Sequence, residues 1–366
     1  MINKIKIEGY KSIKKLDLRL EQINVLIGSN GVGKSNFISF FKFINTIYEQ
    51  RLENYLMTNS ADNLLYFGRK NAEFVEFYLE FNQVNGYEII LQSTLDNKLF
   101  IAQENTFFNK SNGGFNHVYG NGWIKNKINQ NAKESNLSNF EIGSGVGKHV
   151  NDYIKILKIY HFHDTSINSA LRTSSNVNDN KYLKENGSNL AAFLYYLMQK
   201  HNQNFTKIER TIQSVVPFFE RFNLQPNRNY NNEILLEWTE KNHPENYFNA
   251  TNFSDGTIRF IALATLLLQP NLPATIIIDE PELGLHPFAI NKLAGLIRKA
   301  SASSQIIIAT QSVELVNNFE PNNIIAVDRE NNQSIFNRLN NDELGEWLNN
   351  YSIGELWNKN IIGARP

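Results

Sequence analysis

The chain is 366 residues long, with 42% hydrophobic and 20% charged residues, which is typical of a globular protein with one composite domain or two. Lysine and arginine number 36, as do aspartate and glutamate, so the composition excludes a generally basic nucleic-acid-binding protein. The sequence has no cysteine, which excludes disulfides and favours a cytoplasmic protein. No apolar run approaches the roughly 18 residues needed to cross a bilayer, so we expect no membrane partner.

The first residues predict a strand, a glycine-rich loop and a helix, in that order. Residues 2–8 and 17–27 have the patterning of β-strands, and the second run ends directly at a glycine. Large apolar residues then recur at helical spacing from about residue 34 to residue 51.

The middle of the chain predicts an antiparallel β-layer, an insertion and a group of helices. Apolar and polar residues alternate between residues 73 and 103, as in antiparallel strands. Residues 104–148 are rich in Asn, Ser and Gly, which predicts a long irregular or mobile insertion. Helical patterns follow at 186–201 and 204–221.

The last third predicts part of a parallel α/β sheet. The runs ATIIIDE and QIIIAT are continuous and apolar, and helical patterns lie before and between them. Such runs are typical of strands that are buried on both faces, as in parallel sheets covered by helices.

Residues 28–35, GSNGVGKS, match the phosphate-binding pattern G-x-x-x-x-G-K-[ST], after a strand and before a helix. Glycines allow backbone N–H groups to turn toward phosphates, and the following helix directs its positive end at them. Lys34 is expected to neutralise phosphate oxygens, and Ser35 is expected to bind magnesium. The predicted ATP-binding residues of this segment are Gly28, Ser29, Asn30, Gly31, Val32, Gly33, Lys34, Ser35 and Asn36. A similar run at 143–149 is one residue short and lacks the hydroxyl, so we predict a mobile loop there.

The apolar strand ATIIIDE ends in two acids, at the edge where open α/β sheets bind ligands. Asp279 is expected to hold magnesium. Glu280 is expected to orient and deprotonate the water that attacks the γ-phosphorus.

The strand that ends in DEPELGLHP, preceded by NFSDGTIRFIALATLLL, resembles the catalytic half of ABC-type ATPases of the SMC/RecF/OLD-like group. The resemblance implies that Ser254, Asp255 and Gly256 form the signature segment, which contacts ATP bound by a second copy of the chain. It also implies that residues 282–287 contact the opposing site. Gln311 replaces the usual histidine of the switch segment, and glutamine can donate a hydrogen bond but cannot carry a proton as imidazolium. The implied catalytic residues are Glu280, Lys34 and Gln311.

The resemblance implies an α/β fold: an ABC-type ATPase head with a mixed core sheet, an antiparallel β-layer and a helical lobe. We expect one composite ATPase domain with four segments: the phosphate-loop part at 1–72, the β-layer with its flexible insertion at 73–163, the helical lobe at 164–250 and a second nucleotide-binding part at 251–366. The middle shows no sustained heptads, unlike proteins with long coiled-coil arms.

Other positions leave alternatives open. The Q-loop of this group falls on residues 160–166 by chain order, where no glutamine occurs, so His163 or Asp164 would have to serve. With His161, these two residues also leave a metal site open. His286 is expected to start a helix or contact a second subunit. Ser12 and Lys11 occupy a stretch that touches nucleotide in similar ATPases, or else form a plain surface loop.

The leading functional hypothesis is an ATP-binding and ATP-hydrolysing protein, with magnesium, that forms a homodimer around two ATP molecules. It would regulate or power a separate effector, such as a nuclease, in prokaryotic antiviral defence or a toxin system. The alternative is a RecF-like ATP-dependent DNA-binding protein in repair, suggested by the lysines between Lys4 and Lys15, so nucleic acid is a further candidate partner. A transporter subunit is less favoured, because the Q-loop glutamine and switch histidine are missing.

Overall fold

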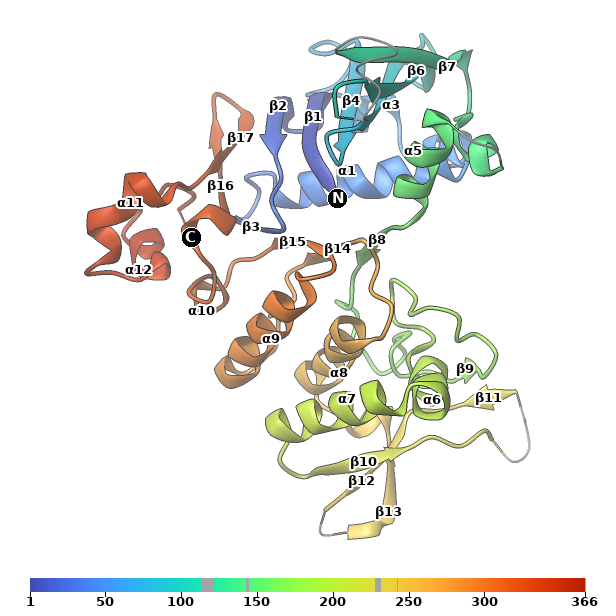
Figure 1. Cartoon of the computed structure of the whole chain (residues 1–366), viewed down its shortest axis with the longest axis vertical. Helices are drawn as coiled ribbons and strands as arrows, with labels where there is room; N and C mark the ends of the chain where they lie inside the picture. Colours follow the sequence, from blue (N-terminus) through green and yellow to red (C-terminus); the bar gives the residue numbers. More distant parts are fainter. Residues whose placement is uncertain (113–121, 143–144, 228–231, 242, 366) are drawn as a thin grey trace. The chain divides into compact units, whose positions relative to one another are not determined.

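Residues 1–112, 122–142, 145–227, 232–241 and 243–365 are described by the computed structural model in Figure 1. They belong to two units, Met1–Leu157 with Pro321–Pro366, and Lys158–Glu320. The last of the four predicted segments, 251–366, therefore contributes to both units.

An antiparallel sheet of six strands forms one side of the first unit, which confirms the predicted β-layer. Its strand order is β2 (Ile13–Arg19), β1 (Ile2–Tyr10), β4 (Phe74–Phe81), β5 (Asn85–Ser93), β6 (Leu99–Asn109) and β7 (Trp123–Ala132). Along β4, buried apolar residues alternate with half-exposed polar residues, which is the pattern that a sheet with one covered face requires.

The long helix α1 (Lys34–Tyr48) covers that buried face, as its course beneath β1 and β4 shows (Figure 1). Phe40 and Phe43 of α1 are fully buried, and their rings lie 4.8 and 5.9 Å from the ring of Phe77 in β4. Tyr10 of β1 stacks on Phe43 with a centroid distance of 6.0 Å. Aromatic packing thus anchors the helix that follows the phosphate loop to the β-layer.

The prediction of an irregular insertion at 104–148 is wrong for much of that segment. Strand β6 continues to Asn109, β7 forms the edge of the sheet, and helix α5 (Val146–Lys155) follows. The side chains of β7 are mostly exposed or half-buried, so an edge strand of this kind needs few apolar residues. The buried carboxylate of Glu104 also accepts hydrogen bonds from the hydroxyl of Tyr87 at 2.7 Å and the backbone N–H of Asn136 at 2.9 Å, which ties the segment to the sheet.

The predicted single strand at 17–27 is two strands in different sheets. Strand β3 (Ile23–Ile27) is buried on both faces and pairs in parallel with β16 (Ile324–Glu330), which pairs antiparallel with β17 (Gln333–Arg338). The backbone N–H of Glu21 donates to Asn24 Oδ1, and Asn24 Nδ2 donates to the Glu21 carbonyl. This local turn breaks the run between the two strands.

The end of the chain closes on the first unit. Helices α11 (Asn341–Leu348) and α12 (Ile353–Asn358) follow β17. The indole of Trp357 is fully buried and donates to the Ala364 carbonyl, while the Ala364 N–H donates to Asp328 Oδ2 of β16 at 2.8 Å. These hydrogen bonds attach residue 364 to β16 and to α12.

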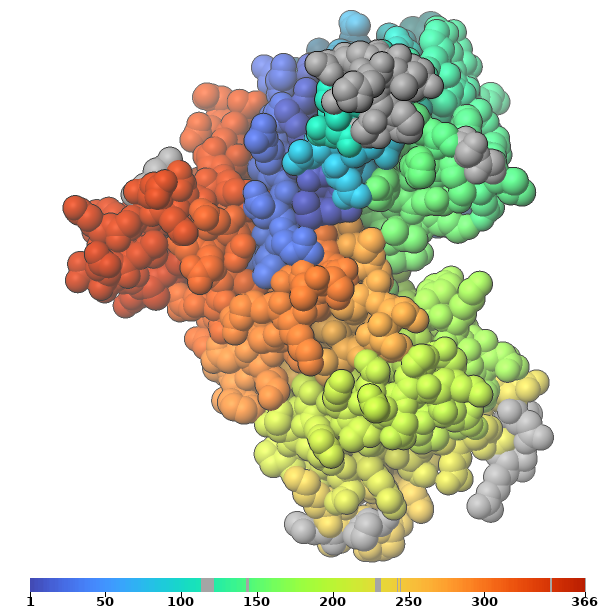
Figure 2. All heavy atoms as spheres, viewed as in Figure 1, coloured from blue at the N-terminus to red at the C-terminus, as the bar shows by residue number. Residues whose placement is uncertain are grey.

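The second unit contains the other predicted parallel strands. Strands β8 (Leu157–Tyr160), β14 (Thr275–Asp279) and β15 (Gln305–Ala309) are neighbours in the order β15-β14-β8, and β14 and β15 run parallel with Asp279 opposite Ala309. Helix α8 (Asp255–Leu268) contacts α7 (Asn202–Val215) and α9 (Pro287–Ala300), and α7 contacts α6 (Leu190–Lys200). The atoms of α6 and α7, in yellow-green, lie on the viewed face of this unit (Figure 2).

The segment 164–250, predicted as a helical lobe, contains strands as well as helices. Strands β10 (Phe219–Asn223), β12 (Glu237–Glu240) and β13 (His243–Asn249) form an antiparallel sheet, and β9 (Ser175–Asn176) pairs with β11 (Glu233–Ile234). Trp238 stacks on Phe253 with a centroid distance of 4.5 Å, so this sheet packs on the chain that leads into α8.

The remaining short elements are α2 (Leu52–Thr58), α3 (Ala61–Leu64), α10 (Val313–Val316) and the 3-10 helices Leu137–Glu141, Ala250–Asn252 and Pro321–Asn323. Within the described ranges, the helices all fall short of the length and apolar character needed to span a bilayer.

Candidate functional site

The phosphate loop lies between β3 and α1 in the first unit. Gly28 and Gly33 have φ angles of 147° and 121°, a backbone conformation that L-residues with side chains rarely adopt. A Cβ at Gly28 would lie 2.4 Å from the Val327 carbonyl oxygen, and one at Gly33 would lie 2.1 Å from Ser334 Oγ. Glycine is therefore required at both positions by backbone shape and by close packing.

Lys34 and Ser35 provide the polar groups of this loop. The Lys34 side chain is 6% exposed, and its ammonium donates to the carbonyls of Gly28 and, at 2.9 Å, Ser29. Ser35 is exposed in the first turn of α1. In this first turn, which the structure describes, α1 has no side-chain cap and no acidic residue, so an anion at the positive end of the helix would meet no carboxylate of the turn. An ammonium, a hydroxyl and the positive end of a helix fit a phosphate accompanied by magnesium.

A serine that the motif did not reveal supports the loop from β17. Ser334 Oγ donates to the Val32 carbonyl and lies 2.7 Å from Ser12 Oγ, which accepts from Asn36 Nδ2 at 2.7 Å. Ser12 and Asn36 therefore lie beside the loop, and nucleotide contact by either residue stays a prediction. Ser334 is 302 residues away from Val32 in the chain, and no motif marks it, so only the fold reveals its contact.

The acids Asp279 and Glu280 lie at the carboxyl end of β14 in the second unit. Glu280 leaves the strand with φ 41°, a left-handed conformation that is costly for a non-glycine residue. Its backbone N–H donates to the Ala309 carbonyl of β15 at 2.8 Å. Gln311, just beyond β15, donates its side-chain amide to the Glu280 carboxylate. The structure thus brings two of the predicted catalytic residues, Glu280 and Gln311, into direct contact.

Glu282 is a second carboxyl near this end of β14, and no separate role was predicted for it. Its Oε1 accepts from the hydroxyl of Thr310 at 2.5 Å and from the backbone N–H of Gln311 at 3.2 Å. Its Oε2 is buried without a hydrogen-bond partner among the described residues. Burial raises the pKa of Glu282, although these hydrogen bonds oppose the rise. Gln311 is therefore held at its side chain by Glu280 and at its backbone by Glu282.

The signature segment forms the start of α8 in the second unit. Ser254 is the N-cap of α8 and accepts from the Thr257 N–H at 3.2 Å. Asp255 follows in the first turn, with a side chain 69% exposed. A Cβ at Gly256 would lie 2.1 Å from the Gly284 carbonyl oxygen, so α8 begins in backbone contact with the loop at 282–286.

His286 has the helix-start role that the sequence predicted. It is the N-cap of α9, where its Nδ1 accepts from the Phe288 N–H at 3.3 Å, and Pro287 is the first helical residue. Contact with a second subunit stays a prediction.

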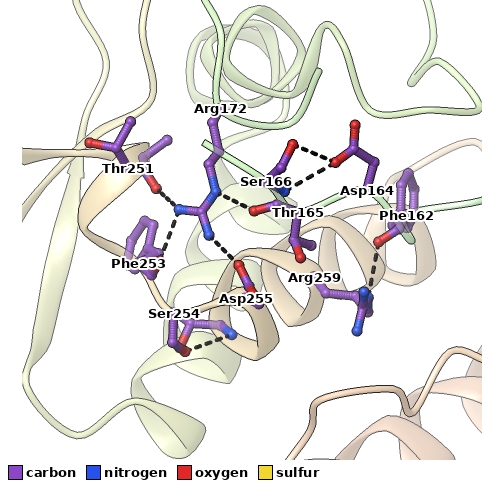
Figure 3. Close-up of polar contacts among 12 residues, drawn as sticks. Phe162, Asp164, Thr165, Ser166, Arg172, Thr251, Phe253, Ser254, Asp255 and Arg259 are labelled. Atoms are coloured by element: carbon purple, nitrogen blue, oxygen red, sulfur yellow. Dashed lines mark hydrogen bonds and ion pairs between the residues drawn. The ribbon is translucent and has the colours of Figure 1, made fainter. Parts of the chain in front are cut away.

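Of the two Q-loop candidates, the structure places His163 beside the acids. Phe162 and His163 line a small pocket together with Asp279 and Glu280. Asp164 instead accepts from Ser166 in a local turn, through the hydroxyl at 2.7 Å, and these hydrogen bonds lower its pKa (Figure 3).

Arg259 of α8 donates from Nε to the Phe162 carbonyl and from Nη2 to the His163 carbonyl, each at 2.9 Å. This side chain connects the start of the Q-loop stretch to α8. The part of the chain that the structure describes holds no group of three or more His, Asp or Glu side chains suited to a metal, which does not support a metal site at His161, His163 and Asp164.

The shorter glycine run at 143–149 lies only partly within the described residues, since Gly143 and Ser144 fall outside them. Gly145 and the residues after it begin α5, and Lys148 forms an ion pair with Asp152 one turn later. A Cβ at Gly147 would lie 2.5 Å from the Phe140 ring, so this glycine has a packing role.

The sequence comparison assigns the chain to a family of ATPases. Residues 23–317 match the family described as "AAA domain, putative AbiEii toxin, Type IV TA system". The chain belongs to this family. The matched residues include the phosphate loop, the signature segment, both acids and Gln311, so the AAA- and ABC-type ATPase motifs all lie within the shared domain.

More distant relatives agree with this assignment. The Old nuclease of Escherichia phage P2 is 21% identical over 378 residues, covering 90% of this chain. This chain spans 60% of the length of that relative. A solved SMC head bound to the C-winged helix domain of ScpA is 16% identical with a TM-score of 0.62, covering 94% of this chain and 99% of its own. An Smc head with an extended coiled coil from Pyrococcus furiosus, bound to the C-terminal domain of ScpA, is 14% identical with a TM-score of 0.53, covering 95% and 98%. The fold is that of an SMC-like ATPase head.

Proposed function

We propose that the chain binds and hydrolyses ATP, and that two copies enclose two ATP molecules to form a closed dimer. The closed state would regulate or power a separate effector in antiviral defence or a toxin system. Membership of the AAA family and the SMC-head fold support the nucleotide chemistry. The biological setting is supported by the name of the phage relative, a nuclease, and by the family description, which includes a toxin system.

ATP binding is supported by the form of the phosphate loop. The N–H groups at the start of α1 would bind phosphate oxygens, and Lys34 would exchange its hydrogen bonds to loop carbonyls for the β- and γ-phosphates. Magnesium, with Ser35 and Asp279 as its proposed ligands, would neutralise phosphate charge.

The hydrogen bond from Gln311 to the Glu280 carboxylate is the observation that carries the proposal of hydrolysis. A general base must be held in a defined direction to take a proton from the attacking water. Gln311 supplies that constraint, and Glu282 and Thr310 in turn hold its backbone. Because glutamine cannot carry a proton, Glu280 is the only proton acceptor of this pair, and hydrolysis should be slow.

Dimer formation is supported by the surface around the signature segment. Ser254 and Asp255 are exposed at the positive end of α8, which suits it to receive a phosphate. The loop packed against Gly256 leads to two exposed apolar side chains, Leu283 at 49% and Phe288 at 55%. Exposed apolar groups next to an anion-binding helix end are suited to contact a second copy once ATP is present.

The RecF-like alternative receives less support from the described residues. Lys4 lies 2.9 Å and Lys6 3.8 Å from the carboxylate of Asp17, and Lys15 lies 3.9 Å from that of Glu8, so these positive charges are partly offset within the sheet. A surface of this kind would bind the phosphate backbone of DNA weakly.

The test is the Glu280→Gln variant, compared with the parent chain. We expect hydrolysis to fall about 10²- to 10⁴-fold, because the general base is lost, while ATP binding is kept. In sedimentation velocity with ATP and magnesium, the variant should form a stable dimer. A variant that stays monomeric at saturating ATP would contradict the sandwich. Binding of labelled DNA that needs ATP and weakens with salt would favour the alternative instead.

A further inference from the structure

Arg172 is a buried side chain that none of the ATPase motifs includes. It lies in the irregular segment after β8, and its side chain is 4% exposed. Its guanidinium donates from Nε to the Thr165 carbonyl at 2.8 Å, from Nη1 to the carbonyls of Phe253, at 2.9 Å, and Ala250, and from Nη2 to Asp255 Oδ1 at 2.9 Å (Figure 3). Arginine side chains are seldom buried unless they are paired, so the burial of Arg172 among four acceptors indicates a structural role.

Three of these acceptors belong to the entry of α8. Ala250 begins the short 3-10 turn that leads to Ser254, Phe253 follows that turn, and Asp255 is the first residue of the helix. Only a planar guanidinium can reach two backbone carbonyls on one side and a carboxylate on the other. Arg172 thus fixes the path of the chain immediately before the signature serine.

Arg172 also balances a charge that is unfavourable for phosphate binding. Asp255 is the first residue of α8, directly after the N-cap Ser254. Its carboxylate lies at the end of α8 that the proposed sandwich would direct at a γ-phosphate. The carboxylate and the phosphate are both negative and would repel each other there. The guanidinium at 2.9 Å offsets the carboxylate charge and adds positive potential behind the helix end.

We propose that Arg172 is a positioning residue for the signature segment: it holds the chain that enters α8 and neutralises Asp255, so that Ser254 can meet ATP bound by a second copy. This inference rests on the proposed ATP-dependent dimer. It assigns Arg172 no contact with the nucleotide of its own chain, so its loss should weaken dimer formation and leave ATP binding to the single chain intact.

The experiment uses the Glu280→Gln chain as the parent and measures two quantities. One is the ATP concentration that gives half-maximal dimer in sedimentation velocity. The other is the affinity of the undimerised chain for a fluorescent ATP analogue at low protein concentration. Arg172→Gln should raise the first quantity about tenfold or more, as expected for lost charge-assisted hydrogen bonds, and should change the second less than twofold. Arg210→Gln, at an exposed position of α7, is the matched control and should change neither.

Two further variants separate the parts of the proposal. Arg172→Lys keeps the positive charge but loses the planar guanidinium with its several donors, so it should raise the ATP concentration for half-maximal dimer by an intermediate amount. This variant also tests the proposal if Arg172→Gln does not fold. Asp255→Asn added to Arg172→Gln should recover part of the loss, because the unbalanced carboxylate is gone.

The inference is overturned if folded Arg172 variants dimerise at the ATP concentration of the parent, or if ATP binding to the single chain weakens in parallel. The proposed function itself would be contradicted if the Glu280→Gln parent, in which Arg172 is intact, failed to dimerise with ATP. The two failures are therefore distinguishable.

Discussion

The phosphate loop of the first unit takes its shape from the backbone, whereas the acidic end of β14 in the second unit takes its shape from side-chain hydrogen bonds. Gly28 and Gly33 adopt conformations and close contacts that other residues cannot share. Glu280 is held instead by Gln311, and Gln311 by Glu282. Substitutions in the loop should therefore act nearly all-or-none, while those around the acids should give graded effects.

The largest expected effect is that of Lys34→Ala. Removal of the ammonium leaves the phosphate charge without its main partner in the loop, so ATP affinity should fall by at least about 100-fold. Isothermal titration with ATP and magnesium measures it. Lys42→Ala, at an exposed position of the same helix, is the control and should bind ATP normally. Retained affinity in the Lys34 variant would show that the loop does not bind nucleotide as proposed.

Gly33→Ala tests whether loop shape depends on packing as well as on φ. The added Cβ would meet Ser334 Oγ, and its φ of 121° is strained for alanine, so we expect a loss of about 2–3 kcal/mol in unfolding free energy or an equivalent loss of ATP affinity. Gly31→Ala is the comparison, because Gly31 has a φ of 79° but a Cβ there meets nothing within 4 Å. Urea denaturation of both variants measures the difference, and equal losses would remove the role given to Ser334.

Gln311→Ala tests the graded behaviour of the second region. Without the amide, Glu280 loses its orienting hydrogen bond but keeps its carboxylate, so we expect hydrolysis to fall about tenfold with ATP affinity unchanged. Steady-state phosphate release with parallel ATP titration distinguishes the two. Gln311→His, which restores the residue usual in related switch segments, should hydrolyse ATP at least as fast as the parent. An unchanged rate in the alanine variant would mean that Gln311 does not position the base.

The smallest expected effect is a change in the pH dependence of stability on replacing Glu282. Burial raises the pKa of this carboxyl in the folded chain above its ordinary value of 4.5, so the folded state favours the protonated form. Its stabilising contribution is present in full below the ordinary pKa and is lost as the pH rises through the raised pKa.

Glu282→Gln stays neutral and keeps the acceptor for Thr310, so its stability should decline less than that of the parent across that window. Thermal unfolding of both chains between pH 4 and pH 8 gives the comparison. Glu346→Gln, at an exposed position of α11, should show the dependence of the parent. Identical pH profiles for Glu282→Gln and the parent would mean that the buried carboxyl does not couple to folding.

The antiparallel layer and the strands β14 and β15 were predictable from local pattern, because alternation and continuous apolar runs report directly which faces of a strand are buried. The segment 104–148 was mispredicted because such a pattern appears only where a strand buries one or both of its faces. Its edge strand β7 buries little, so its polar sequence carries no strand signal, and the anchoring contacts of Glu104 join residues far apart in the chain.

The sequence by itself determined the phosphate loop and the two acids, since each depends on residues adjacent in the chain whose chemistry is specific. Only the tertiary structure decided that Gln311 holds Glu280, that Ser334 packs on Gly33, that His163 and not Asp164 lies by the acids, and that Arg172 holds the entry of α8. The physical reason is that these contacts are made by ordinary polar side chains whose partners lie on other elements. Their identity alone says nothing of what they meet until the strands and helices are packed.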